Sequence, residues 1–442
     1  MFHHKGKLLI FLSSFLIVLY GVSAAFYARD DDAYKELSVF INALSRIKAD
    51  YVEEPDMNRV QEGALRGLLD ALDPYCSFLS KEQYSDLQKR KESGKAGIGL
   101  VLSKRSDVIY VVSCEHDGPA AAAGVRPGDY MIAIDGNQIE DKSILEADSL
   151  LRGAPGSKVK ISLFRNSKSK VFDIEIARSE QAASPVNYKM LDGKVGFLSV
   201  ASLSDSSIGQ AKVKLKTLIS AGAEKIILDL RDCADGASAN GSELANYFIR
   251  SGILYYSQNR QGERVLVVEA NPEKHITDLP LVVLIDGSTA GAAEIAAGAL
   301  KDQKRATVVG EKSFGSGADQ KTIQLKSGAV LILSTAKYYT PGGKVIQDEA
   351  ARNGGILPDL VAPDDETRQD LAVESYYDDK GDASGARRVV PQPESGSPAQ
   401  VDKDEKDEAV KYKQFQEKID KIQIEKALEV LSKSNVPVKK AA

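Results

Sequence analysis

The chain has 442 residues, of which 43% are hydrophobic and 27% are charged, and its formal net charge is −5. This length and composition predict two to three folded domains with hydrophobic cores. The negative charge and the lack of a dominant basic patch argue against a nucleic-acid partner. The three cysteines lie far apart in sequence, which predicts neither a disulfide framework nor a zinc site. With only four histidines present, we expect no metal site and no cofactor.

The N-terminus carries a membrane-targeting pattern. Basic residues in His3–Lys7 precede Leu8–Tyr27, a run of 20 uncharged, mostly apolar residues, and the acidic run Asp30–Asp32 follows. A helix of that length spans about 30 Å, the thickness of the hydrocarbon core of a bilayer. Residues 1–28 are therefore predicted to be a signal anchor in the inner membrane, with the rest of the chain facing the periplasm or another extracytoplasmic space. The alternative is cleavage by signal peptidase near Val22-Ser23-Ala24.

Residues 30–92 are predicted to form a helical region. Apolar residues recur at three- and four-residue spacing in Ala33–Ile47 and again in Met57–Leu72, which is the period of an amphipathic helix. Asp73-Pro74 is expected to end the second helix, because proline cannot continue it. A third helical stretch covers Lys81–Lys91.

Residues 93–180 have a different sequence pattern from the helical region before them, with short β-type runs separated by glycine-containing turns. The predicted strands are Val108–Ser113, Tyr130–Ile134, Lys158–Phe164 and Val171–Ile176. The segment between the first two contains the turn signal Pro127-Gly128-Asp129. This pattern predicts a small β-rich module inserted between two other regions.

Residues 181–370 alternate between short apolar runs and helical segments. The predicted strands are Gly196–Val200, Lys225–Leu230, Leu281–Ile285 and Val330–Ser334. The predicted helices are Ile208–Ile219, Ser242–Ile249 and Ala290–Leu300. Such alternation predicts a mixed α/β core.

The C-terminal part divides into two segments. Residues 371–408 are polar and rich in glycine, proline, serine and charge, which predicts a disordered linker. In residues 409–435, apolar side chains recur at roughly helical spacing among many charges. Two interpretations of this amphipathic helix remain open: it docks on the body of the protein, or it forms a coiled coil or binds a partner.

A series of short motifs runs through the chain in a fixed order. They are Asp73-Pro74-Tyr75, Gly97-Ile98-Gly99-Leu100, Ala123-Gly124-Val125-Arg126-Pro127-Gly128-Asp129, Leu228-Asp229-Leu230-Arg231, Gly310-Glu311, Phe314-Gly315, Tyr338-Tyr339-Thr340-Pro341-Gly342-Gly343 and Gly355-Ile356-Leu357-Pro358-Asp359. From about residue 33 to about residue 365, this order resembles that of the carboxyl-terminal processing, or tail-specific, serine peptidases. Each motif alone is weak, whereas the ordered set is specific.

The resemblance implies a fold class and a kind of partner. The fold is an α/β core of the tail-specific protease type with an inserted β-rich PDZ domain, N-terminal helices and a C-terminal charged helix. Members of this family cut proteins near their C-termini in the periplasm, the lumen or the cell-envelope space, and their PDZ domain binds the free tail. The implied partners are the C-terminal tails of proteins or peptides. Homo-oligomerisation, or pairing with an active protease relative, is a further expectation.

The resemblance also locates the expected catalytic groups, and this sequence lacks two of them. Gly291 stands where the family has its nucleophilic serine, and Ser316 stands where it has its general-base lysine, while Gln320 matches the supporting glutamine. In the oxyanion loop, Asp235 replaces the first of two glycines and Gly236 remains. A serine nucleophile needs an adjacent base, and an aspartate puts negative charge near a developing oxyanion.

Ser288 and Thr289 are candidates for a displaced nucleophile, because they lie just ahead of Gly291. The competing interpretation is that they cap the following helix, which serine and threonine do well. An active serine-type endopeptidase with such a nucleophile therefore remains the alternative to a pseudoprotease.

The peptide-binding side matches the family better. The backbone N–H groups of Gly97, Ile98, Gly99 and Leu100 are expected to hold a terminal carboxylate while the peptide adds a strand to the sheet edge. The competing interpretation is a simple tight turn. We therefore predict a membrane-anchored extracytoplasmic protein that binds C-terminal tails without cleaving them.

Overall fold

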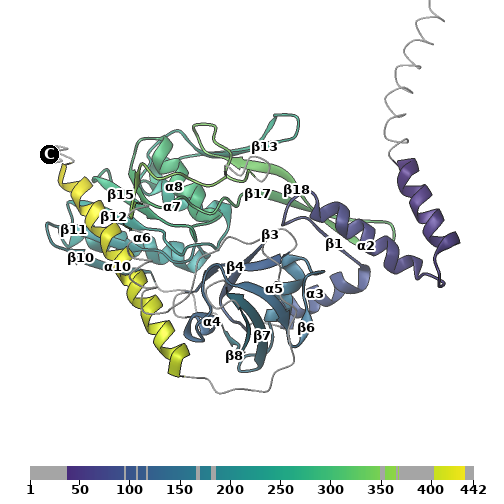
Figure 1. Ribbon diagram of the computed structural model, residues 1–442. Coiled ribbons are helices and arrows are strands. Elements are labelled where there is room, and N and C mark those ends of the chain that lie inside the picture. The colour runs from purple at the N-terminus through teal and green to yellow at the C-terminus, as the bar shows by residue number, and fades with distance from the viewer. Residues whose placement is uncertain are drawn as a thin grey trace, which may run out of the picture. The chain divides into compact units, whose positions relative to one another are not determined.

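The computed structural model describes residues 37–93, 96–105, 108–115, 118–165, 170–180, 186–348, 354–364, 367 and 403–433 (Figure 1). The predicted anchor at residues 1–28, and most of the predicted linker, lie outside these residues. Within the described ranges, none of the helices combines the length and the apolar character that a bilayer span requires. The chain divides into two compact units, Met1–Leu68 and Leu69–Ala442.

The first unit is helical in its described part. One helix covers residues 37–50, and α2 (Met57–Asp70) ends just beyond the unit boundary. Leu37, Ile41 and Ile47, which form the predicted apolar stripe of the first helix, are exposed. The helical character predicted for this region is therefore present, and this stripe remains open to solvent.

The β-rich module is built of short antiparallel strands around one core. Its main sheet has the order β3-β4-β5-β7-β8, with β6 paired to β5, and β2 pairs with β9 below it. The bounds are β2 (Ala96–Gly97), β3 (Leu100–Arg105), β4 (Val108–Cys114), β5 (Tyr130–Ile134), β6 (Asn137–Gln138), β7 (Lys158–Arg165), β8 (Lys170–Ala177) and β9 (Ser179–Glu180). The helices are α4 (Pro119–Ala122) and α5 (Ile144–Leu151). A buried ion pair between Arg165 and Asp129, with Nε and Oδ1 at 2.6 Å, ties β7 to the turn before β5.

The α/β core is a six-stranded sheet with helices on both faces, in the order β10-β11-β12-β15-β16-β19. The strands are β10 (Asn187–Leu191), β11 (Val195–Ser199), β12 (Lys225–Asp229), β15 (Leu281–Ile285), β16 (Thr307–Gly310) and β19 (Leu360–Val361). All of them run parallel except β10. The helices and the short 3-10 turn of this part are α6 (Asp205–Ser220), α7 (Ser238–Asn246), η1 (Pro272–Lys274) and α8 (Ala292–Asp302).

Strand β15 explains why the sheet needs cover on both sides. Leu281, Val283 and Ile285 pack in the core that contains α8, whereas Val282 and Leu284 pack in a second core that contains the C-terminal helix. Successive side chains of a strand point to opposite faces. An uninterrupted apolar run is therefore what a strand buried on both faces requires.

A second sheet was largely missed by the sequence analysis. It has the order β1-β18-β13-β14, with β17 also paired to β18. The strands are β1 (Ser77–Leu79), β13 (Ile253–Asn259), β14 (Arg264–Glu269), β17 (Ala318–Gln324) and β18 (Val330–Tyr339). Helix α3 (Lys81–Ser93) follows β1, and Leu87 of α3 packs with Leu79 and Val330 of this sheet.

The C-terminal helix α10 (Lys403–Lys433) docks on the body of the protein, which resolves the two interpretations left open for it. Ala427 and Leu431 are 0% and 1% exposed and pack against the six-stranded sheet. The helix begins at Lys403, inside the segment 371–408 that was predicted to be a disordered linker. The residues 403–408 are lysine, aspartate and glutamate only, and lysine and glutamate favour helix well enough to extend it.

Candidate functional site

The expected catalytic positions lie at one edge of the six-stranded sheet. Strands β12, β15 and β16 are parallel neighbours, so the loops that follow them leave the sheet on the same side. These loops are residues 230–237, 286–291 and 311–317. In open α/β sheets, ligands bind outside the carboxyl ends of the strands. The topology therefore brings the expected oxyanion loop, nucleophile position and base position together.

Gly291 occupies the N-cap of α8 with a φ of 58° and a ψ of −114°. Residues other than glycine rarely adopt backbone angles in this region of positive φ. A Cβ atom placed on Gly291 would meet only the carbonyl oxygen of Ser316, at 4.0 Å. The expected nucleophile position thus has free space for a side chain and a backbone that disfavours one.

Glu294 joins the expected nucleophile position to the expected base position. Its side chain is fully buried and accepts hydrogen bonds from the N–H of Gly291 at 3.0 Å, of Gly315 at 2.7 Å and of Ser316 at 2.8 Å. The hydroxyl of Ser313 donates to it at 2.5 Å. Burial raises the pKa of Glu294 to about 7, although these four donors favour the charged form. One carboxyl group therefore fixes the geometry of both loops.

Gln320, the expected supporting residue, is exposed and belongs to β17. Its amide Nε2 donates to the carbonyl oxygen of Tyr75 at 2.7 Å. The structure therefore gives Gln320 a role in attaching the segment around Tyr75 to β17.

The expected oxyanion loop is tied to the loop after β15 by Asp286. The carboxylate of Asp286 accepts from the N–H of Asp232 at 3.2 Å, from the N–H of Ser288 at 3.0 Å and from the hydroxyl of Thr289 at 3.0 Å. Burial raises the pKa of Asp286 to about 6. Crowding by the surrounding protein and the neighbouring Asp286 carboxylate raise the pKa of Asp232 well above its usual range, although the residue is exposed. Carboxyl groups, with their charged forms disfavoured, are thus concentrated where a catalytic site would need hydrogen-bond donors.

Asp235 and Gly236 differ in whether the local backbone leaves room for a side chain. The carboxylate of Asp235 accepts from the hydroxyl of Ser202 at 2.8 Å, and crowding around it raises its pKa although the residue is exposed. Gly236 has a φ of 109°, and a Cβ atom there would lie 2.3 Å from the carbonyl oxygen of Leu203. Gly236 is therefore required by the local backbone, whereas Asp235 occupies a position that can hold a side chain.

Ser288 and Thr289 are both buried and use their hydroxyls structurally. Ser288 donates to the carbonyl oxygen of Val112 at 2.8 Å. The one hydroxyl proton of Thr289 is shared between the carbonyl oxygen of Leu230 at 2.8 Å and the carboxylate of Asp286 at 3.0 Å. Neither caps α8, because its N-cap is Gly291. The capping interpretation is therefore wrong in detail, since the two hydroxyls instead bind carbonyl groups from other elements.

Strand β4 of the β-rich module contacts the candidate site directly. Besides the Val112 contact, the hydroxyl of Ser113 donates to the carbonyl oxygen of Asp232 at 2.8 Å. The rings of Tyr110 and Phe314 lie with their centroids 6.2 Å apart. All three loops of the candidate site thus touch one strand of the module.

The expected carboxylate-binding loop lies just before the edge strand β3. Ile98 is 2% exposed and packs in the core of the module, and Leu100 packs beside it. Gly99 has a φ of 75°, and a Cβ atom there would lie 2.8 Å from Oε2 of Glu115. Among the described strands, β3 pairs only with β4, so its other edge is available to an added strand.

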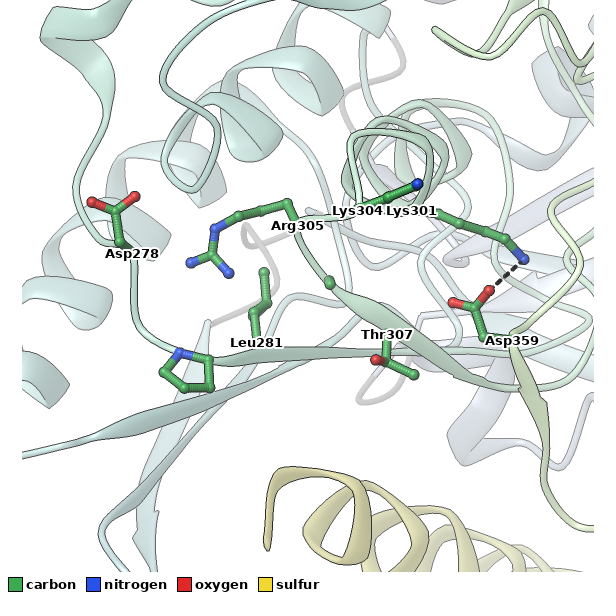
Figure 2. Close-up of a pocket in the computed structure, with 9 residues that line it drawn as sticks. Asp278, Leu281, Lys301, Lys304, Arg305, Thr307 and Asp359 are labelled. Carbon is green, nitrogen blue, oxygen red and sulfur yellow. Dashed lines mark ion pairs between the residues drawn. The ribbon is translucent and has the colours of Figure 1, made fainter. Parts of the chain in front are cut away.

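A cavity of about 480 Å³ lies at the opposite end of α8 from Gly291 (Figure 2). Three cations line it, and two of them already have partners. Lys301 pairs with Asp359 at 3.0 Å, and Arg305 donates to the carbonyl oxygens of Phe248, Thr277 and Leu279. The third is Lys304. This cavity is therefore remote from the expected catalytic positions.

The sequence analysis overlooked the residues that organise the site. None of Asp286, Glu294 and Ser313 was singled out from the sequence as an organising residue. A signal for Asp286 was present, because the acidic residue follows a buried strand directly and precedes Gly287-Ser288-Thr289. No local signal marks Ser313, whose partner Glu294 lies on another element.

Comparisons with known proteins agree with this architecture. Peptidase family S41 matches residues 194–362, and the PDZ domain family matches residues 96–176. The carboxy-terminal-processing protease of Bartonella bacilliformis is 32% identical over 356 residues, covering 80% of each chain. The carboxy-terminal processing protease CtpA of Bacillus subtilis is 30% identical, covering 72% of this chain and 67% of that protein. The solved structure of a photosystem II D1 C-terminal processing protease aligns with a TM-score of 0.60 at 25% identity, covering 73% of this chain and 92% of that one. The chain therefore belongs to the carboxy-terminal-processing protease family, peptidase family S41, and contains a PDZ domain.

Proposed function

We propose that this family member is a membrane-anchored, extracytoplasmic pseudoprotease that binds the C-terminal tails of proteins without cleaving them. The observation that carries the proposal is Gly291, which gives the expected nucleophile position no side chain at all. Ser316 likewise offers no amine at the expected base position. The relatives are named as proteases, so the proposal is a loss of hydrolysis within an otherwise retained fold.

The surrounding scaffold supports lost chemistry rather than a collapsed site. Glu294 still holds the loops of Gly291 and Ser316 together through four hydrogen bonds. The carboxylates of Asp232 and Asp235 lie in the loop that would have to stabilise an oxyanion. Loss of one oxyanion donor alone costs about 10²–10³ in rate, and loss of the nucleophile or the base costs more.

The alternative, an active serine-type endopeptidase with Ser288 or Thr289 as nucleophile, has less support. An attacking hydroxyl must pass its proton to a nearby base. The hydroxyl of Ser288 donates to the carbonyl oxygen of Val112, which is too weakly basic for that role. The hydroxyl of Thr289 lies beside the carbonyl oxygen of Leu230 and the carboxylate of Asp286, so its burial, rather than the lack of a base, counts against it. Both side chains are also buried, at 7% and 0% exposed.

Tail binding is supported by the PDZ domain and by the loop Gly97–Leu100. The loop precedes an edge strand, which is the arrangement in which an extended peptide adds to a sheet and its carboxylate meets backbone N–H groups. This activity does not need the catalytic groups. It therefore survives their replacement.

The test separates binding from cleavage. The full-length chain is incubated with a substrate protein carrying an apolar C-terminal tail, with the same protein amidated at its C-terminus, and with a fluorophosphonate probe. We expect binding only of the free carboxylate form, no cleavage and no probe labelling. Tail-dependent cleavage that Ser288→Ala or Thr289→Ala abolishes would establish the alternative, and equal binding of the amidated protein would contradict tail recognition.

A restored variant tests whether the loss resides in the two positions. Gly291→Ser with Ser316→Lys is expected to regain some cleavage, reduced by backbone strain of about 1–3 kcal/mol at position 291. Adding Asp235→Gly should raise the rate further. If the triple variant remains inactive while still binding tails, the block lies elsewhere in the groove.

The anchor is tested by fractionation. We expect the full-length chain in the membrane fraction and a variant lacking residues 1–28 in the soluble fraction. Protease added to the outer side of intact inner-membrane vesicles of known orientation should report which face carries the PDZ domain. A full-length chain recovered in the soluble cytoplasmic fraction would exclude this localisation.

A further inference from the structure

The C-terminal helix α10 contacts both the six-stranded sheet and the PDZ domain. With 31 residues, it is about 46 Å long at 1.5 Å per residue. Figure 1 shows it in yellow, passing from the strands of the sheet at its C-terminal end to the neighbourhood of α4 in the PDZ domain. The side chains described from Tyr412 onward show how each part of the helix is held.

The C-terminal half of α10 is a firm anchor. Its buried apolar residues pack on β15 and its neighbours. Gln423 is 0% exposed and has both ends of its amide paired: Nε2 donates to the carbonyl oxygen of Ala362 at 2.8 Å, and Oε1 accepts from Arg231 at 2.9 Å. Lys225 donates to the carbonyl oxygen of Leu431 at 2.8 Å. Buried polar groups that are fully paired specify one docked position.

The middle of α10 is hydrogen-bonded to the start of the expected oxyanion loop. Arg231 binds Asp229 through two hydrogen bonds of 2.7 Å, and its Nη1 donates to Asp420 of α10 at 2.6 Å. Its side chain is only 9% exposed. Arg231, which directly precedes Asp232, therefore links the start of the oxyanion loop to both the sheet and α10.

The N-terminal end of α10 reaches the PDZ domain. The guanidinium carbon of Arg126 lies 4.3 Å from the centroid of the Tyr412 ring. Arg126 belongs to the rigid turn before β5, where its N–H donates to Asp129 at 2.9 Å. Desolvation, and secondarily the charge of Asp232, raise the pKa of Tyr412 to about 12. The tyrosine ring therefore contacts the PDZ turn through Arg126.

We propose that α10 is an interdomain strap, which holds the PDZ domain against the candidate site through a releasable contact between Tyr412 and Arg126. In the released state, the C-terminal half of α10 stays packed on the six-stranded sheet, and Tyr412 separates from Arg126. A cation–π contact shifts an equilibrium between held and released states by about 2- to 30-fold. Release loosens the contacts of β4 with the loops at residues 232, 288 and 314, and so increases access to Gly291 and Ser316.

The first experiment is hydrogen exchange on the full-length chain, read in peptides covering residues 231–236 and 286–291. Tyr412→Ala and Arg126→Ala are each expected to speed exchange there by about 2- to 30-fold, and the double variant by no more than either one. Tyr412→Phe keeps the ring and should behave as the wild type, as should Lys413→Ala at the neighbouring exposed position. Additive effects of the two alanine variants, or unchanged exchange, would overturn the strap.

A second readout measures access to the groove. The three native cysteines are buried, so a cysteine introduced by Ser316→Cys reports its own surroundings when treated with a maleimide. Labelling should be faster in the Tyr412→Ala background than in the Lys413→Ala background. Equal rates would contradict exposure of the groove. Neither readout depends on tail binding, so the strap and the proposed function fail independently.

Discussion

Replacing Glu294 by glutamine tests the central organising group of the site. Four donors point at this buried carboxyl group, and three of them are backbone N–H groups. Burial raises its pKa from the usual 4.5 to about 7. Glutamine has the same shape and carries no charge, so it stands in for the protonated form. The variant therefore isolates the effect of ionising this group inside the fold.

The magnitude follows from linkage between proton binding and folding. Because the pKa is higher in the folded than in the unfolded chain, the folded protein holds an extra proton between about pH 4.5 and pH 7. Stability from this group is present at low pH and is lost as the pH rises through that range. The interval corresponds to about 3 kcal/mol in the free energy of unfolding. At pH 5 we expect the free energy of unfolding of the wild type to exceed that of Glu294→Gln by about 1–2 kcal/mol. This is the cost of placing one amide N–H group of the glutamine against another hydrogen-bond donor.

The assay is urea unfolding at several pH values from 5 to 8. Circular dichroism is the suitable signal because the chain contains no tryptophan, and hydrogen exchange at residues 313–316 localises the effect. The wild type should lose about 3 kcal/mol relative to the variant between pH 5 and pH 8. The reasoning is refuted if the wild type instead gains stability over the variant as the pH rises. That outcome would mean that the four donors outweigh desolvation and hold the carboxylate charged.

Three further changes probe the other parts of the chain. Gly99→Ala should weaken binding of a fluorescent peptide with a free carboxylate at least about tenfold, because the backbone at this position needs a positive φ. Gly97→Ala is the control and should bind as the wild type does, because there is open space around Gly97. Equal affinities of the two variants would contradict the assignment of the carboxylate-binding loop. Asp129→Asn removes the negative charge that faces the buried guanidinium of Arg165 and should lower the free energy of unfolding of the PDZ domain by about 3–5 kcal/mol in urea titration. A loss below about 1 kcal/mol would refute this. Leu431→Ala should cost about 2–5 kcal/mol and make α10 sensitive to limited proteolysis, while the exposed Lys421→Ala should do neither.

The sequence predicted the elements whose signal is local. Leu281–Ile285 and Tyr130–Ile134 were predicted with the bounds that the structure has. An apolar run flanked by turn residues is sufficient evidence for such strands. Helix α6 was predicted from Ile208, but it begins at Asp205 after Ser204, whose side chain accepts from the N–H of Ser207. The cap extends the helix beyond its apolar period.

Elements that depend on distant pairing were missed. Strand β1 is only Ser77–Leu79, and it exists because it pairs with residues 330–332 of β18. The strand β14 is exposed along most of its length and lacks the alternation that marks a half-buried strand. Local patterns carry little information about such strands, because β1 depends on a partner far along the chain, and the exposed β14 depends on pairing with the neighbouring β13.

The same reasoning explains what could and could not be predicted about the site. A missing side chain at Gly291 is visible in the sequence, because the absence of a hydroxyl needs no structure. The hydrogen bonding of the Ser288 and Thr289 hydroxyls is not visible in the sequence, since their partners Val112 and Leu230 lie on strand β4 and in the loop after β12. These contacts count against a displaced nucleophile, because both hydroxyls are buried and engaged in hydrogen bonds within the fold. The Val112 contact also joins the PDZ domain to the candidate site, so any change that moved Ser288 toward catalysis would have to break the packing of β4 against it.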